Sequence, residues 1–424
     1  MNYPIWDVPL ISGGLVIAAI AVVHVFISHF AVGGGIYLVL TERKARKENS
    51  QELLGFIRSQ SLFFLLLTLV GGALTGVGIW FSISLVSPDA TSSLLHVFVW
   101  IWATEWVFFL VEVVSILVYY YGWDRLAPED HMRVGWIYAG SAWVSLVLIT
   151  GILAFMLTPG AWTDTHDLHD AFFNPTFLPS VLLRTGVAVA LGGVYALVTG
   201  SLLTDEGLRE RVIRYSALWV RWAFLVIPLA GVWFFFAAPE RARHLPIGGS
   251  GVVQIFLILT LALSLFVFAF THLGAYWGAR RFGLPMALVL FITAFAVAGA
   301  GEWVREAVRK PYIISNYMYS NSIRLDDVGR LPDQGVLSTA LWSRVPSIEP
   351  GNESQAGHEV FRLLCSSCHT VAGYNAIRPL VKGWSEDYID YQLQNLDVLK
   401  EVMPPFLGSE QERRALAKWL SGLN

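Results

Sequence analysis

The sequence is poor in charged residues. Asp, Glu, Lys and Arg make up 14% of the 424 residues, whereas apolar residues make up 55%. An average soluble domain carries roughly 25% charged residues. The mean hydropathy is +0.56 and the formal net charge is only −3. This composition excludes an ordinary soluble chain and gives no basis for binding nucleic acid, so it predicts a membrane protein that contacts the lipid bilayer.

Cysteine is also nearly absent, because the whole chain contains only Cys365 and Cys368. Both stand in the stretch GHEVFRLLCSSCH, which ends in the pattern Cys-x-x-Cys-His. No cysteine is left for a separate disulfide framework or for a four-cysteine zinc site. Two cysteines spaced in this way and followed by histidine are typical of covalent haem attachment. We therefore expect one covalent haem c on these thiols, with His369 as an axial ligand of its iron.

The first ten residues, MNYPIWDVPL, lack lysine and arginine. A cleavable signal peptide starts with basic residues, so the first apolar run is expected to be a retained helix. Eight apolar runs are long enough to cross the ~30 Å hydrocarbon core of a bilayer. They lie at roughly 11–41, 56–86, 94–121, 133–158, 179–203, 216–238, 251–278 and 282–307.

Basic residues gather in alternate loops between these runs. Lysine or arginine follows the first, third, fifth and seventh runs, whereas 87–93 and 159–178 contain neither. Only PERARH, at 239–244, breaks the alternation. By the positive-inside rule, both termini lie on the outer side of the membrane. We expect a multi-pass protein of the bacterial inner membrane whose termini face the periplasm, the side on which haem c is attached.

Composition divides the chain into three parts. Residues 1–308 form the membrane part, 309–350 a polar connector, and 351–424 a small tail. A tail of about 74 residues has a limited core of its own, and a covalent haem would complete it. Met403, in the stretch MPPF, is the candidate second axial ligand of haem c, because a thioether favours reduced iron. This tail resembles a class I cytochrome c, and the resemblance implies that Pro379 lies near His369 and helps to orient it.

Ionisable side chains inside apolar runs are costly, so they are candidates for function. His24 and His29 are five residues apart, which turns them about 140° from each other on a helix. They therefore cannot face one haem together. Glu105 and Glu112 are seven residues apart, which places them on one helix face about 10 Å apart. Such a pair suits a proton path, or one carboxylate could bind iron. The remaining candidates are Arg184, His272 and Glu302.

Several of these stretches resemble subunit I of cytochrome bd-type quinol oxidases. The closest likeness is EVVSILVYYYGWDRL, at 112–126. HVFISHFAVG at 24–33, the pair Thr75-Gly76 and GEWVREAVRKPY at 301–312 extend it over about residues 1–312. The resemblance implies an all-α, polytopic bundle with haem b or d in the membrane, and His24 as a ligand of a membrane haem iron. The tail resembles a class I cytochrome c, which implies a small all-α domain.

Several features of the bd family are missing, and two of them bear on how electrons enter. The histidine that binds the family's outer haem falls at or beside Arg184, and the family's long quinol-binding loop is reduced to about a dozen residues, 239–250. We expect Arg184 and Arg309 to contact haem propionates, because guanidinium groups bind carboxylates. Weaker candidates for membrane haem ligands are Glu302, His29 and His272.

Three functions fit these features. In the first, electrons enter through haem c and pass to a membrane haem near His24, as in a cytochrome c-linked bd-like oxygen reductase. In the second, quinol is oxidised at another pocket and haem c exports electrons to a periplasmic acceptor. In the third, the chain is a non-catalytic anchor or wire in a larger respiratory complex. The bd resemblance implies a second membrane subunit, and the first two functions require a periplasmic electron-transfer partner.

Overall fold

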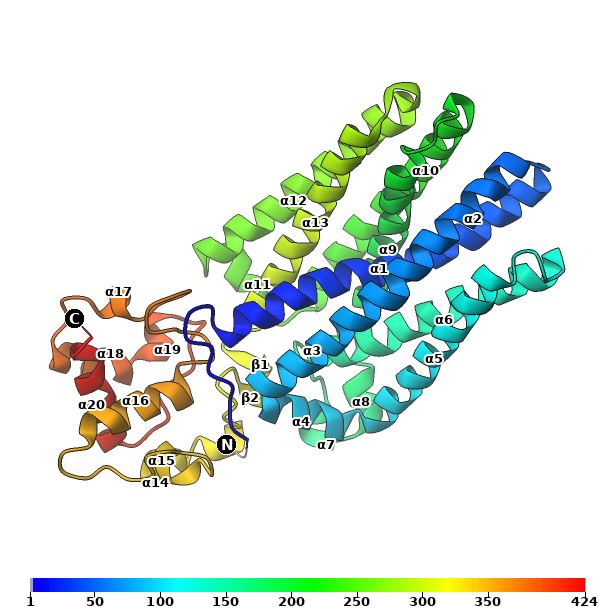
Figure 1. Cartoon of the computed structure of the whole chain (residues 1–424). Helices are drawn as coiled ribbons and strands as arrows, with labels where there is room; N and C mark the ends of the chain where they lie inside the picture. Colours follow the sequence, from blue (N-terminus) through cyan, green and yellow to red (C-terminus); the bar gives the residue numbers. More distant parts are fainter. Residues whose placement is uncertain (1–2, 424) are drawn as a thin grey trace.

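The computed structural model describes residues 3–423. Within them, eight helices are long and apolar enough to cross a membrane, which confirms the predicted number and the all-α membrane bundle. Figure 1 shows these helices as one bundle, with the tail at one end. The spans are α1 (Gly13–Lys47), α2 to α3 (Gln51–Val86), α5 (Val99–Tyr121), α6 (Pro128–Phe155), α9 (Phe177–Gly200), α10 (Glu206–Ala237), α12 with its π-helical end (Gly251–Trp277) and α13 (Leu284–Ala307).

Large apolar side chains cover the outside of this bundle. Leu74, Trp100 and Leu229 are 73%, 74% and 74% exposed. A surface with so many exposed apolar groups is stable against hydrocarbon rather than water. The helices satisfy their own peptide groups, as a bilayer core requires. The bundle is therefore a multi-span membrane domain.

Some helix limits differ from the expected ones. α1 continues through the basic residues to Lys47, and the second span begins at Gln51. The third span begins at Val99, because a separate short helix, α4 (Pro88–Val97), precedes it. Pro88 stands in the first turn of α4, where its fixed φ and missing N–H are tolerated. Hydropathy alone does not mark the break between α4 and α5, because the apolar residues at the end of α4 (Leu94, Leu95 and Val97) run directly into those of α5.

The two ends of the bundle differ in charge. Residues 3–12, which precede α1, lie at the end that carries the tail, as Figure 1 shows, and we call this the tail end. The loops at the opposite end join α1 to α2, α5 to α6, α9 to α10 and α12 to α13. These loops and their flanking helix ends hold most of the basic residues of the membrane part, residues 1–308, from Lys44 and Arg46 to Arg280 and Arg281. We call this end the basic end.

Short elements cover the tail end of the bundle. Besides α4, those before the connector include α7 (Trp162–Thr165), α8 (Leu168–Phe172) and α11 (Glu240–His244). In the connector, β1 (Tyr312–Ile314) pairs antiparallel with β2 (Met318–Tyr319). Ile314 and Met318 are buried in one cluster with Phe155 and Trp162 of the bundle. The first part of the connector is therefore packed on the membrane domain.

The tail consists of five helices: α16 (Glu353–Leu364), α17 (Arg378–Val381), α18 (Glu386–Gln394), α19 (Leu396–Leu399) and α20 (Glu410–Ser421). α16 packs on α20, and the α20 side chains Leu416 and Leu420 are buried there. The rest of the connector, with α14 (Leu331–Gln334) and α15 (Val336–Thr339), joins the same core. Glu412 accepts the N–H groups of Val336 and Leu337, at 3.0 and 2.7 Å.

A buried ion pair also stabilises the tail. Glu359 accepts a hydrogen bond from Arg362 Nε at 2.8 Å and another from the Arg344 amide at 2.8 Å. The Arg362 guanidinium lies 4.3 Å from the centre of the Trp342 ring. Burial alone would raise the pKa of Glu359, but these two donors outweigh it, and the pKa lies below its ordinary value.

Candidate functional site

The Cys-x-x-Cys-His stretch directly follows α16 in the tail. The amides of Cys368 and His369 both donate to the Cys365 carbonyl, at 3.1 and 2.9 Å. These two hydrogen bonds close a turn that contains both cysteines and the histidine. The two cysteines are free thiols and form no disulfide. Burial raises the pKa of the Cys365 thiol to about 12. Cys365 therefore remains a neutral thiol beside the apolar core of the tail.

The hydrogen bond of His369 fixes which ring nitrogen is available to a metal. Nδ1 lies 3.0 Å from the carbonyl oxygen of Asn375, which only accepts, so Nδ1 carries the proton and Nε2 keeps its lone pair. Burial also lowers the pKa of His369 and favours the neutral ring. The expectation that Pro379 orients this histidine is wrong. The loop after His369 turns back at Asn375, four residues before Pro379, and the Asn375 carbonyl accepts the hydrogen bond from His369.

Met403 lies in the loop between α19 and α20 and is partly buried. Its amide donates to the Lys400 carbonyl at 2.8 Å, which holds the loop in a turn. Its role as the second axial ligand stays a prediction.

His24 in α1 is held in the same tautomer as His369. Its Nδ1 lies 3.0 Å from Thr75 Oγ1 in α3. The single Thr75 hydroxyl proton is directed to the Gly71 carbonyl at 2.7 Å. Thr75 must therefore accept from His24 Nδ1–H, which leaves the lone pair on Nε2. Gly76 follows Thr75, and a Cβ there would lie 3.2 Å from the His24 ring, so a small residue lets α3 approach.

His29 lies further along α1, where α1 crosses α9. The two backbones touch: a Cβ on Gly33 would lie 1.7 Å from the Ala188 carbonyl oxygen. Small residues make such close crossings possible in membrane helices. One turn before this contact, His29 is 5% exposed and its Nδ1 donates to the Val25 carbonyl at 2.8 Å. Arg184 stands one turn before Ala188 on α9, and its positive charge interacts electrostatically with the His29 ring.

Arg184 belongs to a buried charge network. It lies 3.7 Å from Glu302 of α13, and Glu302 accepts a hydrogen bond from Arg305 at 2.6 Å. The Glu302 carboxylate is therefore shared between two guanidinium groups. Arg309, one turn after Arg305, pairs with Glu306 and donates to the Met156 sulfur at 3.1 Å.

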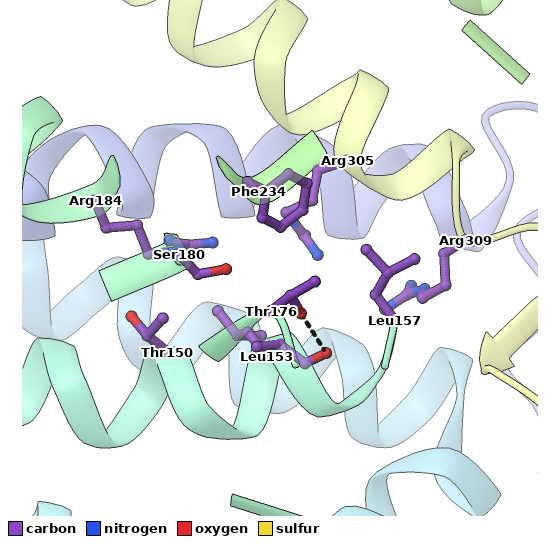
Figure 2. Close-up of a pocket in the computed structure, with 10 residues that line it drawn as sticks. Thr150, Leu153, Leu157, Thr176, Ser180, Arg184, Phe234, Arg305 and Arg309 are labelled. Atoms are coloured by element: carbon purple, nitrogen blue, oxygen red, sulfur yellow. Dashed lines mark hydrogen bonds between the residues drawn. The ribbon is translucent and has the colours of Figure 1, made fainter. Parts of the chain in front are cut away.

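Three of these side chains line one cavity. Figure 2 shows the guanidinium groups of Arg184, Arg305 and Arg309 turned toward it. The cavity lies between α6, α9, α10 and α13 and has a volume of about 30 Å³. Thr150, Thr176 and Ser180 add hydroxyl groups to its wall (Figure 2). Arg309 is 5% exposed and its Nε has no hydrogen-bond partner among residues 3–423. An anionic group would satisfy this donor.

His272 is in a different state from His24 and His29. It lies in the π-helical end of the α12 span (Thr271–Trp277). Trp277 Nε1 donates to its Nε2 at 3.3 Å, so Nε2 is already engaged and Nδ1 carries the proton. That Nδ1 is buried and has no hydrogen-bond partner within residues 3–423. The structure does not bring His272 together with His24, and its role as an iron ligand stays a prediction.

Glu105 and Glu112 form part of a ladder between α5 and α6. Glu105 accepts a hydrogen bond from Ser145 at 2.8 Å. Glu112 Oε1 is buried and has no hydrogen-bond partner among the described residues. Tyr138, seven residues before Ser145 on α6, donates to the Ala31 carbonyl at 3.2 Å. The Glu105–Ser145 hydrogen bond thus joins α5 to α6, and Glu112 and Tyr138 stand seven residues further toward the basic end on these two helices.

The next interval toward the basic end holds a cluster that the sequence analysis missed. Tyr119 on α5 donates to Glu42 at 2.7 Å, and His131 on α6 lies 2.9 Å from the same carboxylate. Arg46 also donates to Glu42, at 2.7 Å. Glu42 and His131 are both 0% exposed. The repeated spacing of Glu105, Glu112 and Tyr119 is the sequence signal that could have found this cluster.

Comparison with known proteins identifies the membrane part. The family described as cytochrome bd terminal oxidase subunit I matches residues 15–245, more than half of the chain. This chain belongs to that family. A solved structure of a bd oxidase from Geobacillus thermodenitrificans superimposes with a TM-score of 0.64 at 15% identity, and covers 72% of this chain and 88% of that chain. At this identity the likeness shows the fold alone. No curated protein matches the sequence.

Membership in the bd subunit I family makes the protein a membrane haem oxidoreductase of respiration. It implies b- or d-type haems within the bundle, a lipid bilayer around it, and quinone as a partner of the family. A bacterial inner membrane is consistent with this family and with the eight spans. The family match ends at residue 245, so the tail lies outside it.

Proposed function

We propose that the protein passes electrons from a covalent haem c on its tail to a b- or d-type haem in its bundle, where oxygen is reduced. The observation that carries the proposal is where the haem-attachment loop rests. The carbonyl oxygen of Ser367, between the two cysteines, lies 3.8 Å from the Cβ position of Gly14 in the first turn of α1. His24 is ten residues further along α1, a rise of about 15 Å.

A second contact supports the same orientation of the tail. Glu401, two residues before Met403, lies 3.9 Å from His244 of α11. Both loops that carry the proposed haem c ligands therefore touch the bundle. The short 239–250 connection, which replaces the family's quinol loop, supplies α11 for this contact.

The residues of the tail fit a c-type haem. The Cys365 and Cys368 thiols would attach it, and His369 would bind its iron through Nε2, which the Asn375 carbonyl leaves free. Met403 would bind from the other side. Such a group supplies reversible one-electron transfer. Residues 351–424 would form the domain around it, together with the connector residues that share its core.

The residues of the bundle fit a further haem near α1. His24 would ligate iron through Nε2, since Thr75 fixes the proton on Nδ1. Arg184 and Arg309 would bind propionates, and the buried, unpartnered Nε of Arg309 supports an anionic group there. Glu302 already shares its carboxylate between Arg184 and Arg305. We therefore assign Glu302 to charge balance in this network. His29 cannot face the same haem as His24, so it remains a candidate ligand only for a different group.

Protons would reach the site along α5. Glu112 and Glu105 lie on one face of α5 and lead away from the buried Glu42–His131 cluster near the basic end. Ser145 hydrogen-bonds Glu105 and extends the polar ladder on α6. Carboxylates in such positions hold and release protons within a bilayer. With the basic end inside the cell and both termini in the periplasm, this route delivers cytoplasmic protons.

The reverse direction is the second candidate. Quinone is a partner of the bd family, so quinol could be oxidised in the bundle and haem c could export the electrons. The lost quinol loop favours the first direction. A second membrane subunit would cover part of the exposed apolar surface of the bundle, and a soluble periplasmic protein would exchange electrons with the tail.

Spectra and oxygen uptake of the purified protein in lipid nanodiscs test the proposal. We expect haem c together with a b- or d-type haem, and oxygen uptake driven by a one-electron donor that reduces haem c. Replacement His24→Ala should remove the membrane haem signal and oxygen uptake while haem c remains. Haem c without any second haem would contradict the proposal. Reduction of haem c by quinol without oxygen uptake would support the reverse direction.

A further inference from the structure

The first residues of the chain cross the tail end of the bundle before α1 begins. We call residues 3–12 the N-terminal strap. Figure 1 shows this blue segment running between the bundle and the tail. The Trp6 amide donates to the Leu85 carbonyl at the end of α3, at 2.8 Å. The Tyr3 hydroxyl lies 3.4 Å from Ser92 Oγ in α4. The strap is thus fixed to the membrane domain.

The far end of the strap binds the tail through main-chain atoms. The Tyr374 amide donates to the Leu10 carbonyl at 2.8 Å. The neighbouring residue, Gly373, lies so close that a Cβ there would be 2.0 Å from the Leu10 carbonyl oxygen and 2.6 Å from its carbon. Both are backbone atoms, so no side-chain rotation could relieve the overlap. Gly373 does not have a positive φ, and the contact itself therefore requires glycine.

The loop that the strap binds is the loop that orients His369. Asn375 accepts the His369 Nδ1–H at 3.0 Å, and its side-chain amide donates to the Cys368 carbonyl at 2.8 Å. The Thr370 hydroxyl donates to the Tyr374 carbonyl at 2.8 Å. Residues 368–375 therefore form one hydrogen-bonded unit. A movement of the strap relative to this unit would move the haem-attachment site relative to α1.

We propose that the N-terminal strap positions the haem c domain for electron transfer to the bundle, and that Gly373 is the residue that admits it. The inference rests on the proposed function, because it assumes electron exchange between the tail and the membrane site. The strap is continuous with α1, which carries His24, so one segment of backbone joins both sites. Gly373 and Leu10 act by position and do not touch the reacting groups.

The test uses Gly373→Ala in the full-length protein, with Gly422→Ala as the matched control. Gly422 lies in the same domain, has a φ of −72°, and its Cβ position is 3.4 Å from the nearest atom, an ordinary contact. Flash-induced or stopped-flow spectroscopy measures the rate of electron exchange between haem c and the membrane haem. We expect Gly373→Ala to slow this rate at least about tenfold, because the docked state becomes less populated. The haem c spectrum and potential should not change.

Hydrogen–deuterium exchange separates docking from electron transfer. Gly373→Ala should speed amide exchange in residues 3–12 and 370–376, and Gly422→Ala should leave both segments as in the wild type. Unchanged amide exchange, or faster amide exchange with an unchanged electron-transfer rate, would overturn the inference. A wild-type protein without electron exchange between haems would refute the proposed function, and amide exchange would still decide whether the strap holds the loop. If Gly373→Ala loses haem c, Tyr374→Pro replaces it, because proline removes the hydrogen bond to Leu10 without adding a Cβ at Gly373. The amide exchange and the electron-transfer rate of Tyr374→Pro then test the inference in the same way.

Discussion

The hydroxyl of Thr75 determines which nitrogen of His24 is free to bind iron. Replacing Thr75 by valine keeps the shape of the side chain but removes its oxygen, which accepts from His24 at 3.0 Å and donates to Gly71 at 2.7 Å. Each hydrogen bond contributes about 1 kcal/mol net. Loss of the partner that orients a metal-binding histidine typically lowers metal affinity about 10- to 100-fold. We therefore expect Thr75→Val to weaken retention of the membrane haem by about this factor.

The assay is the ratio of membrane haem to haem c in protein purified through increasing detergent washes. Thr260→Val is the matched control, because the Thr260 hydroxyl also donates to a carbonyl one turn earlier, that of Phe256, at 2.8 Å. We expect the ratio to fall for Thr75→Val and to remain constant for Thr260→Val. An unchanged ratio and spectrum for Thr75→Val would refute the assignment of His24 as the ligand.

Further outcomes follow from the buried carboxylates. Glu112→Gln should slow oxygen uptake at least about 100-fold, because general acid–base groups contribute this much. Reduction of both haems by an added donor should persist. A normal turnover rate would exclude Glu112 from the proton path. Glu42→Ala should destabilise the bundle by about 3–5 kcal/mol, because His131 loses its buried partner; an unchanged melting temperature in nanodiscs would contradict this. The pKa of Glu359 is lowered on folding, so its contribution to stability is complete above about pH 4.3 and is lost as pH falls through the folded value. The wild type should therefore be more stable than Glu359→Gln near neutral pH, and this difference in free energy of unfolding should shrink toward zero as the pH falls. Denaturant titrations of the haem c spectrum at several pH values measure it, and a difference that does not change with pH would show that Glu359 has no such role.

Much of the fold could be predicted because hydrocarbon imposes simple rules on sequence. Eight long apolar runs correspond to the eight spans. The alternate loops in which basic residues gather all lie at one end of the bundle, the basic end. The limits at Lys47 and Val99 could not be predicted from hydropathy. α1 continues past its apolar segment because its charged residues pair along the helix, as Lys44 does with Glu48. α4 separates from α5 through local backbone geometry at Phe98.

The site was harder to predict than the fold. The spacing of Glu105 and Glu112 correctly placed them on one face of α5. Glu42 and His131, in contrast, stand in the charged stretches TERKARK and PEDHMR, which resemble solvated loop residues in sequence. Their burial arises only when α1, α5 and α6 pack together. The contact of Leu10 with Gly373 joins residues more than 360 positions apart, and no local pattern encodes it.

The central claim is that haem c and a membrane haem near His24 act in one electron path to oxygen. Mixing the fully reduced protein in nanodiscs with oxygen, and following both haems within a single turnover, tests this most directly. We predict that the membrane haem is oxidised first and that haem c is oxidised in the same turnover, with Glu112→Gln delaying the later phase. Oxygen consumption while haem c stays reduced, or oxidation of haem c with no membrane haem signal, would contradict the account.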